Sequence, residues 1–443
     1  MKGPRQKTTA NPGLAARRAA TGLLSTVLDE RQALDGLMDV AETDSAFNRL
    51  DDRDRRLARA IVSTTLRRFG EIEAVLDRMI ERRPRRAGAL IHVLQTAAAQ
   101  ILFMEVPDHA AVSIAMEQIG ADRDGKHFKG LANAVLRRLV RERDMILKMA
   151  DAARLDTPDW LWDRWTATYG AETARRIAEA HLVEPSLDLS VRSDPQGWAK
   201  KLDGIVLPTG SVRLVPTGRI AELPGYDEGA WWVQDAAAAL PAKLLGDVAG
   251  KRVADLCAAP GGKTATLAAA GADVTAIDIA PARMERLGAN LARLGLTARA
   301  VSADILAWQP EERFDAILLD APCTATGTIR RHPDAAWLKR PEDIAKLATL
   351  QSRMIDRAVS WLKPGGTLVY CTCSLEPEEG EQQVAAARER HGLRPLPIAP
   401  AEIGGLSDTI TAEGYVRTLP CHLPDPNPRL AGLDGFFIAR LCP

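Results

Sequence analysis

The sequence predicts a multidomain protein with an all-α N-terminal domain, a small α+β middle segment and a C-terminal α/β domain built on a Rossmann-like, doubly wound sheet. Three observations support this prediction. Apolar residues recur at helical spacing through the first 150 residues. Alternating, strand-like segments bounded by turn residues follow them. The second half then contains four short apolar runs in successive βα units, each with an aspartate at or near its end.

Composition sets the broad class of the protein. With 443 residues, 46% of them hydrophobic, the chain has core enough for two or three domains. Its six cysteines all lie at or after Cys257 and show no zinc-site spacing, which indicates neither a disulfide framework nor a metal site. The longest apolar stretch, 89–104, contains His92, Gln95 and Gln100 and falls short of the roughly 20 residues that span a bilayer. We therefore expect a monomer in a reducing, cytoplasmic compartment, with no metal and no membrane partner.

The N-terminal part divides into a short arm and a helical domain. Residues 1–14 are expected to form a flexible basic arm, although a transit peptide has a similar composition, because no acid occurs in the first 28 residues. Residues 15–150 are expected to form the helical domain. Within it, Leu57, Ile61 and Thr65 recur at helical spacing, and Gly70 is expected to end that helix.

The zero net charge of the chain hides an uneven distribution. Residues 1–150 hold 26 basic and 20 acidic side chains, so an equal negative excess lies in the remainder. Much of the basic excess occurs in clusters at 53–56, 67–68, 82–86 and 137–141. Such clusters suit contacts with nucleic-acid phosphates. Taken singly, each is better explained by solvated helix faces with i,i+4 ion pairs.

Residues 151–232 differ from the helical domain in composition and in apolar pattern. Trp160, Trp162 and Trp165 lie on a predicted amphipathic helix, and 187–192 and 206–215 alternate like strands. Six of the nine tryptophans fall between Trp160 and Trp232, which favours a hydrophobic core over platforms for base stacking. Residues 233–443 form the expected catalytic domain, with a helix opening at Gln234.

Four expected strands in the C-terminal domain each carry an acid. They are 253–256 with Asp255, 274–277 before Asp278, 300–302 before Asp304, and 316–319 before Asp320. Carboxyl ends of parallel strands meet at one crevice, where such sheets bind ligands, so these acids suit a cofactor with an adenosine group. The first strand enters a glycine-containing turn without the spacing of a P-loop or a dinucleotide fingerprint. A single acid of this kind is as well explained as a helix N-cap.

Two cysteines follow predicted strand ends about fifty residues apart, Cys323 after Asp320 and Cys373 between Thr372 and Ser374. Carbon 5 of cytosine is too poor a nucleophile to accept a methyl group unaided. A thiolate that adds at carbon 6 converts the ring into an enamine whose carbon 5 can attack. One cysteine can add and the other can assist release, so the pair suggests covalent attack on a pyrimidine.

Together these motifs resemble the Sun/Fmu (RsmB-type) family of S-adenosylmethionine-dependent RNA cytosine-C5 methyltransferases, and the match runs nearly end to end. The segments that carry it are 255–264 (DLCAAPGGKT), 320–323 (DAPC), 326–334 (TGTIRRHPD), 370–374 (YCTCS) and 434–437 (DGFF). Three segments of the N-terminal domain, 52–59, 106–112 and 129–138, are similar to the NusB-like RNA-binding fold. The resemblance implies S-adenosyl-L-methionine as cofactor and a Rossmann-like methyltransferase domain.

The resemblance also implies a role for each site residue. The loop around the methionine and ribose side of the cofactor would consist of Cys257, Ala258, Ala259, Pro260, Gly261, Gly262 and Lys263. Asp278 would bind the ribose, Asp304 the adenine edge, and Asp320 would lie between cofactor and target base. Cys373 would be the nucleophile, with Lys263 as a candidate cation that activates it, and Cys323 would help to break the adduct.

One position departs from the family pattern. Cys371 stands two residues before Cys373, where the family usually has alanine or serine. If the strand continues, the two side chains share a face, and a disulfide between such neighbours is geometrically poor. We interpret Cys371 as a small packing residue and retain Cys373 as the nucleophile.

The expected substrate is an RNA loop, because a cytosine must leave its stack to reach the thiols. Arg330, Arg331 and His332 follow the Asp320–Cys323 segment and are expected to contact RNA phosphates, with surface salt bridging as the alternative. The resemblance implies small-subunit ribosomal RNA, naked or in a pre-ribosomal particle. Three alternatives are a tRNA cytosine-C5 methyltransferase, a DNA cytosine methyltransferase, which would not need Cys373, and a non-catalytic RNA-binding assembly factor.

Overall fold

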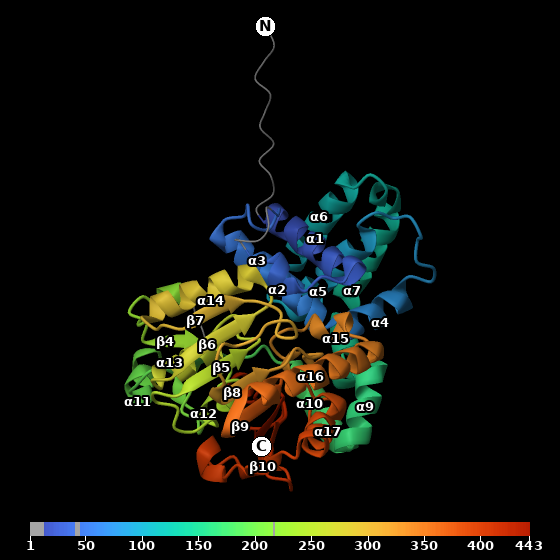
Figure 1. Ribbon diagram of the computed structural model, residues 1–443. Helices are drawn as coiled ribbons and strands as arrows, with labels where there is room; N and C mark the ends of the chain where they lie inside the picture. Colours follow the sequence, from blue (N-terminus) through green and yellow to red (C-terminus); the bar gives the residue numbers. More distant parts are fainter. Residues whose placement is uncertain (1–12, 40–44, 216–217) are drawn as a thin grey trace. The chain divides into compact units, whose positions relative to one another are not determined.

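The structure, a computed structural model, describes residues 13–39, 45–215 and 218–443 (Figure 1). The chain forms two compact units. The helical unit consists of the described part of residues 1–164 together with His332–Leu338, and the sheet unit consists of Trp165–Arg331 and Lys339–Pro443. Nearly all of the basic arm expected at 1–14 lies outside the described residues. No helix among the described residues is long and apolar enough to cross a membrane.

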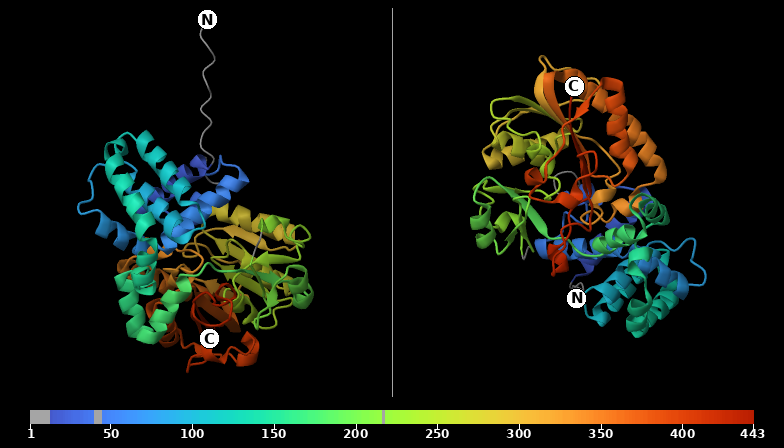
Figure 2. Two further views of the ribbon diagram at one scale, coloured as in Figure 1. Left: turned by 180° about the vertical axis from the view of Figure 1, so that it is seen from behind. Right: turned by 90° about the horizontal axis from the view of Figure 1, so that it is seen from below.

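The helical unit is built around one central helix. Its helices are α1 (Leu14–Glu30), α2 (Leu34–Leu37), α3 (Asp52–Arg67), α4 (Phe69–Met79), α5 (Leu90–Phe103), α6 (Asp108–Ala121), α7 (Lys129–Met149), α8 (Ala152–Leu155) and α15 (Ala335–Leu338), with a 3-10 turn at Gly125–Phe128 and the first part of α9 (Asp159–Tyr169). Helix α5 is buried around most of its circumference and contacts α1, α3, α4, α6 and α7, which appear in blue to cyan in Figure 2. A helix that is apolar on all sides belongs in a core.

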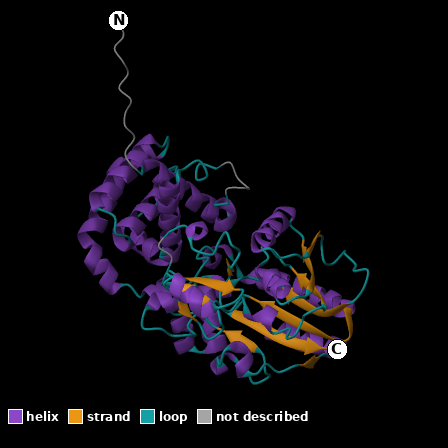
Figure 3. Ribbon diagram, turned by 90° about the vertical axis from the view of Figure 1, so that its left-hand side faces the viewer, coloured by secondary structure: helices purple, strands orange, loops and turns teal. Residues whose placement is uncertain are grey.

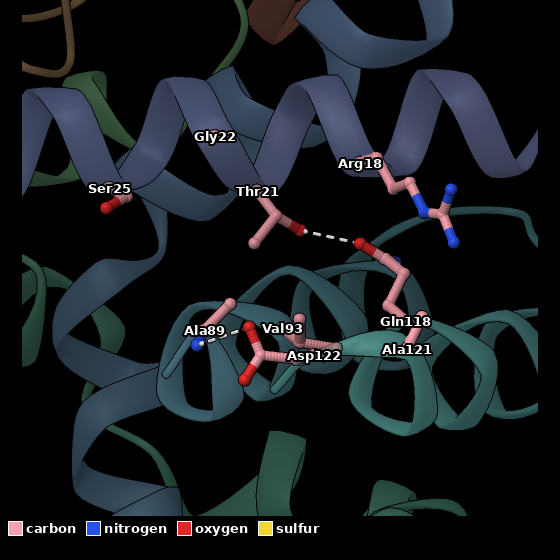
Figure 4. A pocket seen from close by; sticks show the side chains of 9 residues that line it. All are labelled: Arg18, Thr21, Gly22, Ser25, Ala89, Val93, Gln118, Ala121 and Asp122. Atoms are coloured by element: carbon pink, nitrogen blue, oxygen red, sulfur yellow. Dashed lines mark hydrogen bonds between the residues drawn. The ribbon is translucent and has the colours of Figure 1, made fainter. Parts of the chain in front are cut away.

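Polar side chains of α5 are buried with their partners. Arg17 Nε donates to Gln100 Oε1 over 2.6 Å, and Thr21 Oγ1 lies 3.3 Å from both Thr96 Oγ1 and Gln118 Oε1. Figure 4 shows the Thr21–Gln118 bond at the wall of a cavity of about 450 Å³ between α1, α5 and α6. These bonds satisfy groups that would otherwise destabilise the core by their burial. They fix which faces of α1 and α6 turn inward.

The segment His332–Leu338 belongs to the helical unit although it lies about 170 residues beyond the rest of that unit, which ends at Arg164. Trp337 Nε1 donates to the carbonyl of Leu66 over 2.8 Å, and its ring meets Phe69 edge-on at 4.9 Å. The Asp334 carboxylate accepts the Leu34 backbone N–H at 3.0 Å. The segment therefore completes the core formed by α1 and α3.

Gly70 does not end a helix, contrary to the sequence expectation. Helix α3 ends at Arg67, and Gly70 is the second residue of α4. A Cβ atom at this position would lie 1.7 Å from the carbonyl oxygen of Leu155. Glycine is required here because two backbone segments approach closely. Such a contact between distant residues cannot be recognised from the sequence around Gly70.

Substitution of Gly70 tests this close approach. We expect Gly70→Ala to lower the free energy of unfolding by about 1 to 3 kcal/mol, because the added methyl forces the α4 and α8 backbones apart. Urea unfolding measures the change. The matched control is Gly22→Ala in α1, where nothing lies within 4 Å and alanine should stabilise by about 0.5 to 1 kcal/mol. Equal unfolding midpoints for Gly70→Ala and wild type would contradict the interpretation.

The sheet unit contains a main sheet of eight strands in the order β10-β12-β9-β8-β5-β6-β7, with β11 paired to β12. Its strands are β5 (Arg252–Leu256), β6 (Asp273–Asp278), β7 (Arg299–Ser302), β8 (Phe314–Asp320), β9 (Leu362–Thr372), β10 (Arg394–Pro395), β11 (Val416–Thr418) and β12 (Phe436–Cys442). The five strands from β9 to β7 are parallel, and β12 joins β9 antiparallel. The doubly wound sheet expected from the sequence is confirmed.

Helices cover both faces of this sheet (Figure 3). They are α12 (Leu240–Lys243), α13 (Gly262–Ala269), α14 (Pro281–Leu294), α16 (Pro341–Trp361) and α17 (Glu381–His391). Along β8, Ile317 and Leu319 pack in one core with α16 and α17, whereas Ala316 and Leu318 pack in another with α12 and α13. Alternation of side chains along a strand produces these two cores. The near-continuous apolar run of β8 follows from burial on both faces.

A smaller sheet precedes the main one. Strands β1 (Leu187–Val191), β2 (Ile205–Val206), β3 (Val212–Leu214) and β4 (Trp231–Val233) pair in the order β2-β3-β1-β4 beside the helix α11 (Pro195–Lys201), and α10 (Ala171–His181) comes before them. Trp165, Trp231 and Trp232 are buried, in agreement with the core interpretation of the tryptophans.

The helix expected to open at Gln234 begins only at Leu240. The backbone N–H of Ala236 binds the Asp188 carboxylate at 3.0 Å, and that of Ala237 binds Asp235 at 2.8 Å. These side-chain acceptors compete with the helical pattern and hold the segment as turns. The prediction of a helix from Gln234 was wrong for this reason.

Candidate active site

The two motif cysteines lie together at the carboxyl end of the main sheet. Strands β8 and β9 are adjacent and parallel, with Asp320 opposite Cys371. The loops that follow them therefore start side by side, and the sulfur atoms of Cys323 and Cys373 are 3.4 Å apart. Both side chains are partly accessible. This distance permits an S–H···S hydrogen bond in which either sulfur can donate.

The pKa values of Cys323 and Cys371 are raised by different neighbours. The hydrogen bond to Cys373, with burial and the nearby Glu379 carboxylate, raises the pKa of Cys323 well above its ordinary value. Cys323 therefore keeps its proton and can donate it toward the Cys373 sulfur. Burial and the charge of Asp320 also raise the pKa of Cys371, which is fully buried with its sulfur 3.4 Å from Asp320 Oδ1. Cys371 thus occupies the packed side of the site.

Lys263 and Asp320 form an ion pair beside these thiols. Lys263 Nζ lies 2.7 Å from Asp320 Oδ2 and 5.3 Å from the centre of the Phe436 ring. Burial disfavours the ammonium, but the charges of Asp320 and of neighbouring acids prevail and raise the pKa of Lys263. The lysine remains charged, and its contacts lie toward Asp320 rather than toward Cys373.

Arg331 is the arginine whose charge acts on Cys373. Its guanidinium binds the fully buried carboxylate of Asp434, with Nε 2.7 Å from Oδ2, while a third of its side chain stays exposed. Burial disfavours the guanidinium, but Asp434 raises the pKa of Arg331, and the Cys373 sulfur contributes in the same direction. Arg331 therefore carries its positive charge close enough to the Cys373 sulfur for the two groups to interact.

Arg330 has an internal position that differs from its predicted contact with RNA. It is 3% exposed, its guanidinium lies 3.2 Å from Asp235 Oδ2, and it donates to the Ala431 carbonyl over 3.1 Å. Groups of the protein therefore hold this guanidinium, and its contact with RNA stays a prediction. His332 belongs to the helical unit, where its Nδ1 lies 3.0 Å from Asp35 Oδ2.

A chain of buried charges continues from Arg330 into the small sheet. Asp434 N–H donates to Asp235 Oδ1 over 3.3 Å, and Arg213 binds Asp188 through two bonds of 2.6 and 2.7 Å. Arg213 also donates to the carbonyls of Leu430 and Gly432. Sequence reasoning missed Asp188, Arg213 and Asp235 because isolated acids and arginines form no motif. Asp434 stood in a quoted motif without an assigned role.

The presumed cofactor edge lies at the ends of β5, β6 and β7. Asp278 is 2% exposed, and its carboxylate accepts the backbone N–H groups of Ala259 at 3.2 Å and Ala280 at 3.1 Å. Asp304 is exposed and accepts the Leu306 N–H at 2.9 Å. Ile279, directly after Asp278, is 66% exposed. Acidic groups and an uncovered apolar side chain therefore occur together at this edge.

Comparisons with known proteins agree over the whole chain. The model of the family "16S rRNA methyltransferase RsmB/F" matches residues 242–442, and the NusB family model matches residues 14–141. The small-subunit ribosomal RNA methyltransferase B of Cronobacter sakazakii is 34% identical over 96% of this chain and 98% of its own length. The chain belongs to the RsmB/F family of 16S rRNA methyltransferases. The resemblance stated from the sequence is thereby confirmed, as are the enzyme class and the cofactor, S-adenosyl-L-methionine.

Two further similarities agree with this result, one in sequence and one in fold. The protein of the same name from Salmonella typhi is 36% identical over 84% of this chain and 90% of its own. The crystal structure of PH0851 covers 98% of this chain and 99% of its own with a TM-score of 0.76, at 21% identity. At that level of identity the second similarity supports the fold alone.

The residues at the presumed cofactor edge fit S-adenosylmethionine. Gly261 has φ +101°, and a Cβ atom there would lie 2.9 Å from Leu287 Cγ, so the loop backbone has a bend that a side chain would obstruct. Asp255 Oδ1 is buried, and no hydrogen-bond partner for it occurs among the residues that the structure describes. Small loop residues, the acids and exposed Ile279 together suit a ligand with a sugar, a flat base and no polyphosphate. Among the described residues there is no group of three His, Cys, Asp or Glu side chains suited to a metal ion.

The buried Asp255 predicts a pH-dependent stability. Burial raises its pKa to about 7, against the hydrogen bond from Thr264 Oγ1 at 2.6 Å. An unfolded aspartate titrates near pH 4, so the folded state holds the extra proton between about pH 4 and 7. The associated stability is present below pH 4 and is lost as pH rises through about 7.

Asp255→Asn should remove this titration while it retains an acceptor for Thr264. We expect the wild type to lose about 2 to 3 kcal/mol of unfolding free energy relative to this variant between pH 5 and pH 8. Urea unfolding of both proteins at the two pH values measures the difference. Parallel pH profiles would show that the carboxylate does not titrate in this range.

Proposed function

We propose that this protein transfers a methyl group from S-adenosylmethionine to carbon 5 of a cytosine in 16S ribosomal RNA, through a covalent bond between Cys373 and carbon 6. The observation that carries the proposal is the 3.4 Å separation of the Cys323 and Cys373 sulfur atoms at the carboxyl end of the sheet. The relatives named above as small-subunit ribosomal RNA methyltransferase B, together with the NusB match, favour ribosomal over transfer RNA. The close pair of Cys323 and Cys373 argues against a non-catalytic assembly factor, because such a factor would not need two adjacent thiols.

The first step requires a thiolate at Cys373. In our proposal the S–H of Cys323 donates to that sulfur, and the Arg331 cation stabilises its negative charge. The sulfur adds at carbon 6, the carbon 5–carbon 6 π pair shifts onto carbon 5, and carbon 5 becomes nucleophilic. Asp320, fixed by Lys263, lies beside this position and is proposed to orient the base.

The bound cofactor supplies an electrophilic methyl group for carbon 5. We assign its ribose to Asp278, its adenine edge to Asp304 and Ile279, and its methionine side to the loop from Cys257 to Lys263. In this loop the Cys257 thiol is not a second nucleophile, because burial raises its pKa well above the ordinary value. The loop contributes backbone and shape rather than reactivity.

Release returns the enzyme to its starting state. After addition, the Cys373 sulfur is bonded to carbon and no longer holds the Cys323 proton, so Cys323 can release that proton to solvent and then act as a base. It takes the proton from carbon 5, the electron pair restores the carbon 5–carbon 6 double bond, and the bond from carbon 6 to Cys373 breaks. Each cysteine thus has one role.

We further propose the domain limits 1–14 for the arm, 15–150 for the NusB-like domain, 151–232 for the middle segment and 233–443 for the catalytic domain. Several arginines of the helical domain have ion-pair partners, among them Arg55 with Asp52 and Arg138 with Glu142. By contrast, Arg82, Arg85 and Arg86 are exposed, and no ion pair occurs for them among the described residues. These three are the proposed phosphate contacts of that domain, in a monomer that acts in the cytoplasm on naked ribosomal RNA or on a pre-ribosomal particle.

Separate cysteine variants test the proposed mechanism. Cys373→Ala should form no covalent complex with RNA, because nothing remains to add at carbon 6. Cys323→Ala should still add and methylate once but should remain attached to its RNA, since the base for release is absent. Denaturing gel electrophoresis after incubation with 16S ribosomal RNA and S-adenosylmethionine distinguishes free from attached protein.

The opposite pattern, a persistent complex with Cys373→Ala and none with Cys323→Ala, would reverse the two roles. The double variant Cys371→Ala/Cys323→Ala serves as the control for the neighbouring thiol. If it lost the complex that Cys323→Ala retains, Cys371 would be the nucleophile.

The salt dependence of RNA binding tests the three exposed arginines. A triple Arg82, Arg85, Arg86→Ala variant should reduce the slope of log affinity against log salt by about 2, because each lost phosphate contact removes about 0.7 on single-stranded RNA. Filter binding at several salt concentrations gives the slope. The matched control is Arg55, Arg83, Arg138→Ala, whose arginines are held in ion pairs and should change it less. Equal slopes for both triple variants would exclude the proposed contacts.

A further inference from the structure

Glu379 is a buried acid that the mechanism above does not use. It ends the 3-10 turn Pro377–Glu379 and is fully buried. Its carboxylate accepts the backbone N–H of Thr324 at 3.0 and 3.2 Å and also binds the Thr324 hydroxyl. Gln351 Nε2 donates to Oε1 over 3.0 Å and to the Pro322 carbonyl over 2.9 Å. The residues on both sides of Cys323 are thus held through this carboxylate and its partner.

The same residue also holds the loop of the other cysteine. Its backbone carbonyl accepts Tyr370 Oη–H at 2.7 Å and Thr372 Oγ1–H at 3.3 Å, from the end of β9. The hydroxyl of Thr324 lies 3.1 Å from that of Ser374, the residue after Cys373. Glu379 therefore binds directly or through one hydroxyl to the neighbours of both thiols.

The electrostatic setting of Glu379 is unusual for a residue that only stabilises a fold. No ion pair with Glu379 is found in the described part of the chain. Burial raises its pKa, against the hydrogen bonds from Ser374, Thr324 and Gln351 that favour the charged form. An unpaired buried charge is costly, so an apolar side chain would serve packing better. A carboxylate is needed where several donors from different loops must meet at one point.

We propose that Glu379 is a positioning residue that sets the separation of the two sulfur atoms and so controls release of the methylated RNA. The inference rests on the proposed covalent mechanism and extends it. Addition requires only Cys373, whereas release requires Cys323 close to the proton of carbon 5. Loss of the Glu379 contacts loosens the Cys323 loop, although the bond from the Gly327 N–H to the Cys373 carbonyl still joins the two loops. Release then becomes slow while addition continues.

The variants Glu379→Ala and Glu379→Gln test this assignment. The first loses all side-chain contacts, and the covalent RNA complex should accumulate to at least about tenfold the wild-type level, the effect of losing one charged hydrogen bond. The second keeps one acceptor for the Thr324 N–H and a donor for a neighbouring hydroxyl, so it should accumulate less. Single-turnover methyl transfer into in vitro transcribed 16S RNA, followed by denaturing electrophoresis, measures attached and free methylated RNA separately.

Two further variants control the comparison. Glu402→Gln makes the same change at a carboxylate that pairs with Arg440 at 2.6 Å, and it should show wild-type release. Thr324→Val removes only the hydroxyl that links Glu379 to Ser374 and should also trap RNA, whereas Thr324→Ser should restore release. The Thr324 pair decides the question if Glu379→Ala does not fold, as judged by circular dichroism and calorimetric cofactor binding.

The outcomes separate this inference from the proposed function. If Cys323→Ala traps RNA but neither folded Glu379→Ala nor Thr324→Val does, the positioning role is wrong and the covalent mechanism stands. Equal slowing of methyl transfer and release, without more attached RNA, would likewise overturn the positioning role. If Cys323→Ala traps no RNA, release does not depend on Cys323, and the release step of the proposed function fails.

Discussion

The candidate site depends on one constraint, the parallel pairing of β8 with β9. This pairing places Asp320 opposite Cys371, so the two loops that follow must leave the sheet side by side. Neither Cys323 nor Cys373 is positioned by its own strand, because both lie just beyond the strand ends. Their 3.4 Å separation instead requires bonds between the loops. The Gly327 N–H to Cys373 carbonyl bond and the buried hydrogen bonds around Glu379 and Thr324 supply them.

Charge is distributed around the thiols in two separate sets. Lys263 and Asp320 form one pair, on the side of Cys371. Arg330, Arg331 and Asp434 form the other, and Asp235 extends it toward the small sheet, where Arg213 and Asp188 bind each other. Acids balance arginines within the second set, so burial of these charges is tolerated. The small sheet therefore supports the position of Arg331, a role quite apart from the base stacking considered for its tryptophans.

Local patterns predicted the elements well and the long-range contacts poorly. The apolar runs at 253–256, 274–277, 300–302 and 316–319 all lie in strands of the main sheet. The interpretations of Gly70 and Gln234 were wrong because the Leu155 carbonyl and the Asp188 carboxylate come from distant parts of the chain. The ion pair of Arg330 with Asp235 was not foreseen for the same reason. Glu379 had no assigned role, since a lone glutamate among others in a loop shows no pattern until its donors converge.

The sequence by itself determined the family, the cofactor and the succession of four strands along the chain, because motifs and apolar periodicity are properties of nearby residues. It also singled out Cys323 and Cys373 among six cysteines. Only the tertiary structure decided which charges face which thiol. In the structure Lys263 forms its ion pair with Asp320, and Arg331 is the cation whose charge acts on Cys373. Such choices depend on burial and on partners more than fifty residues away, and no local pattern encodes them.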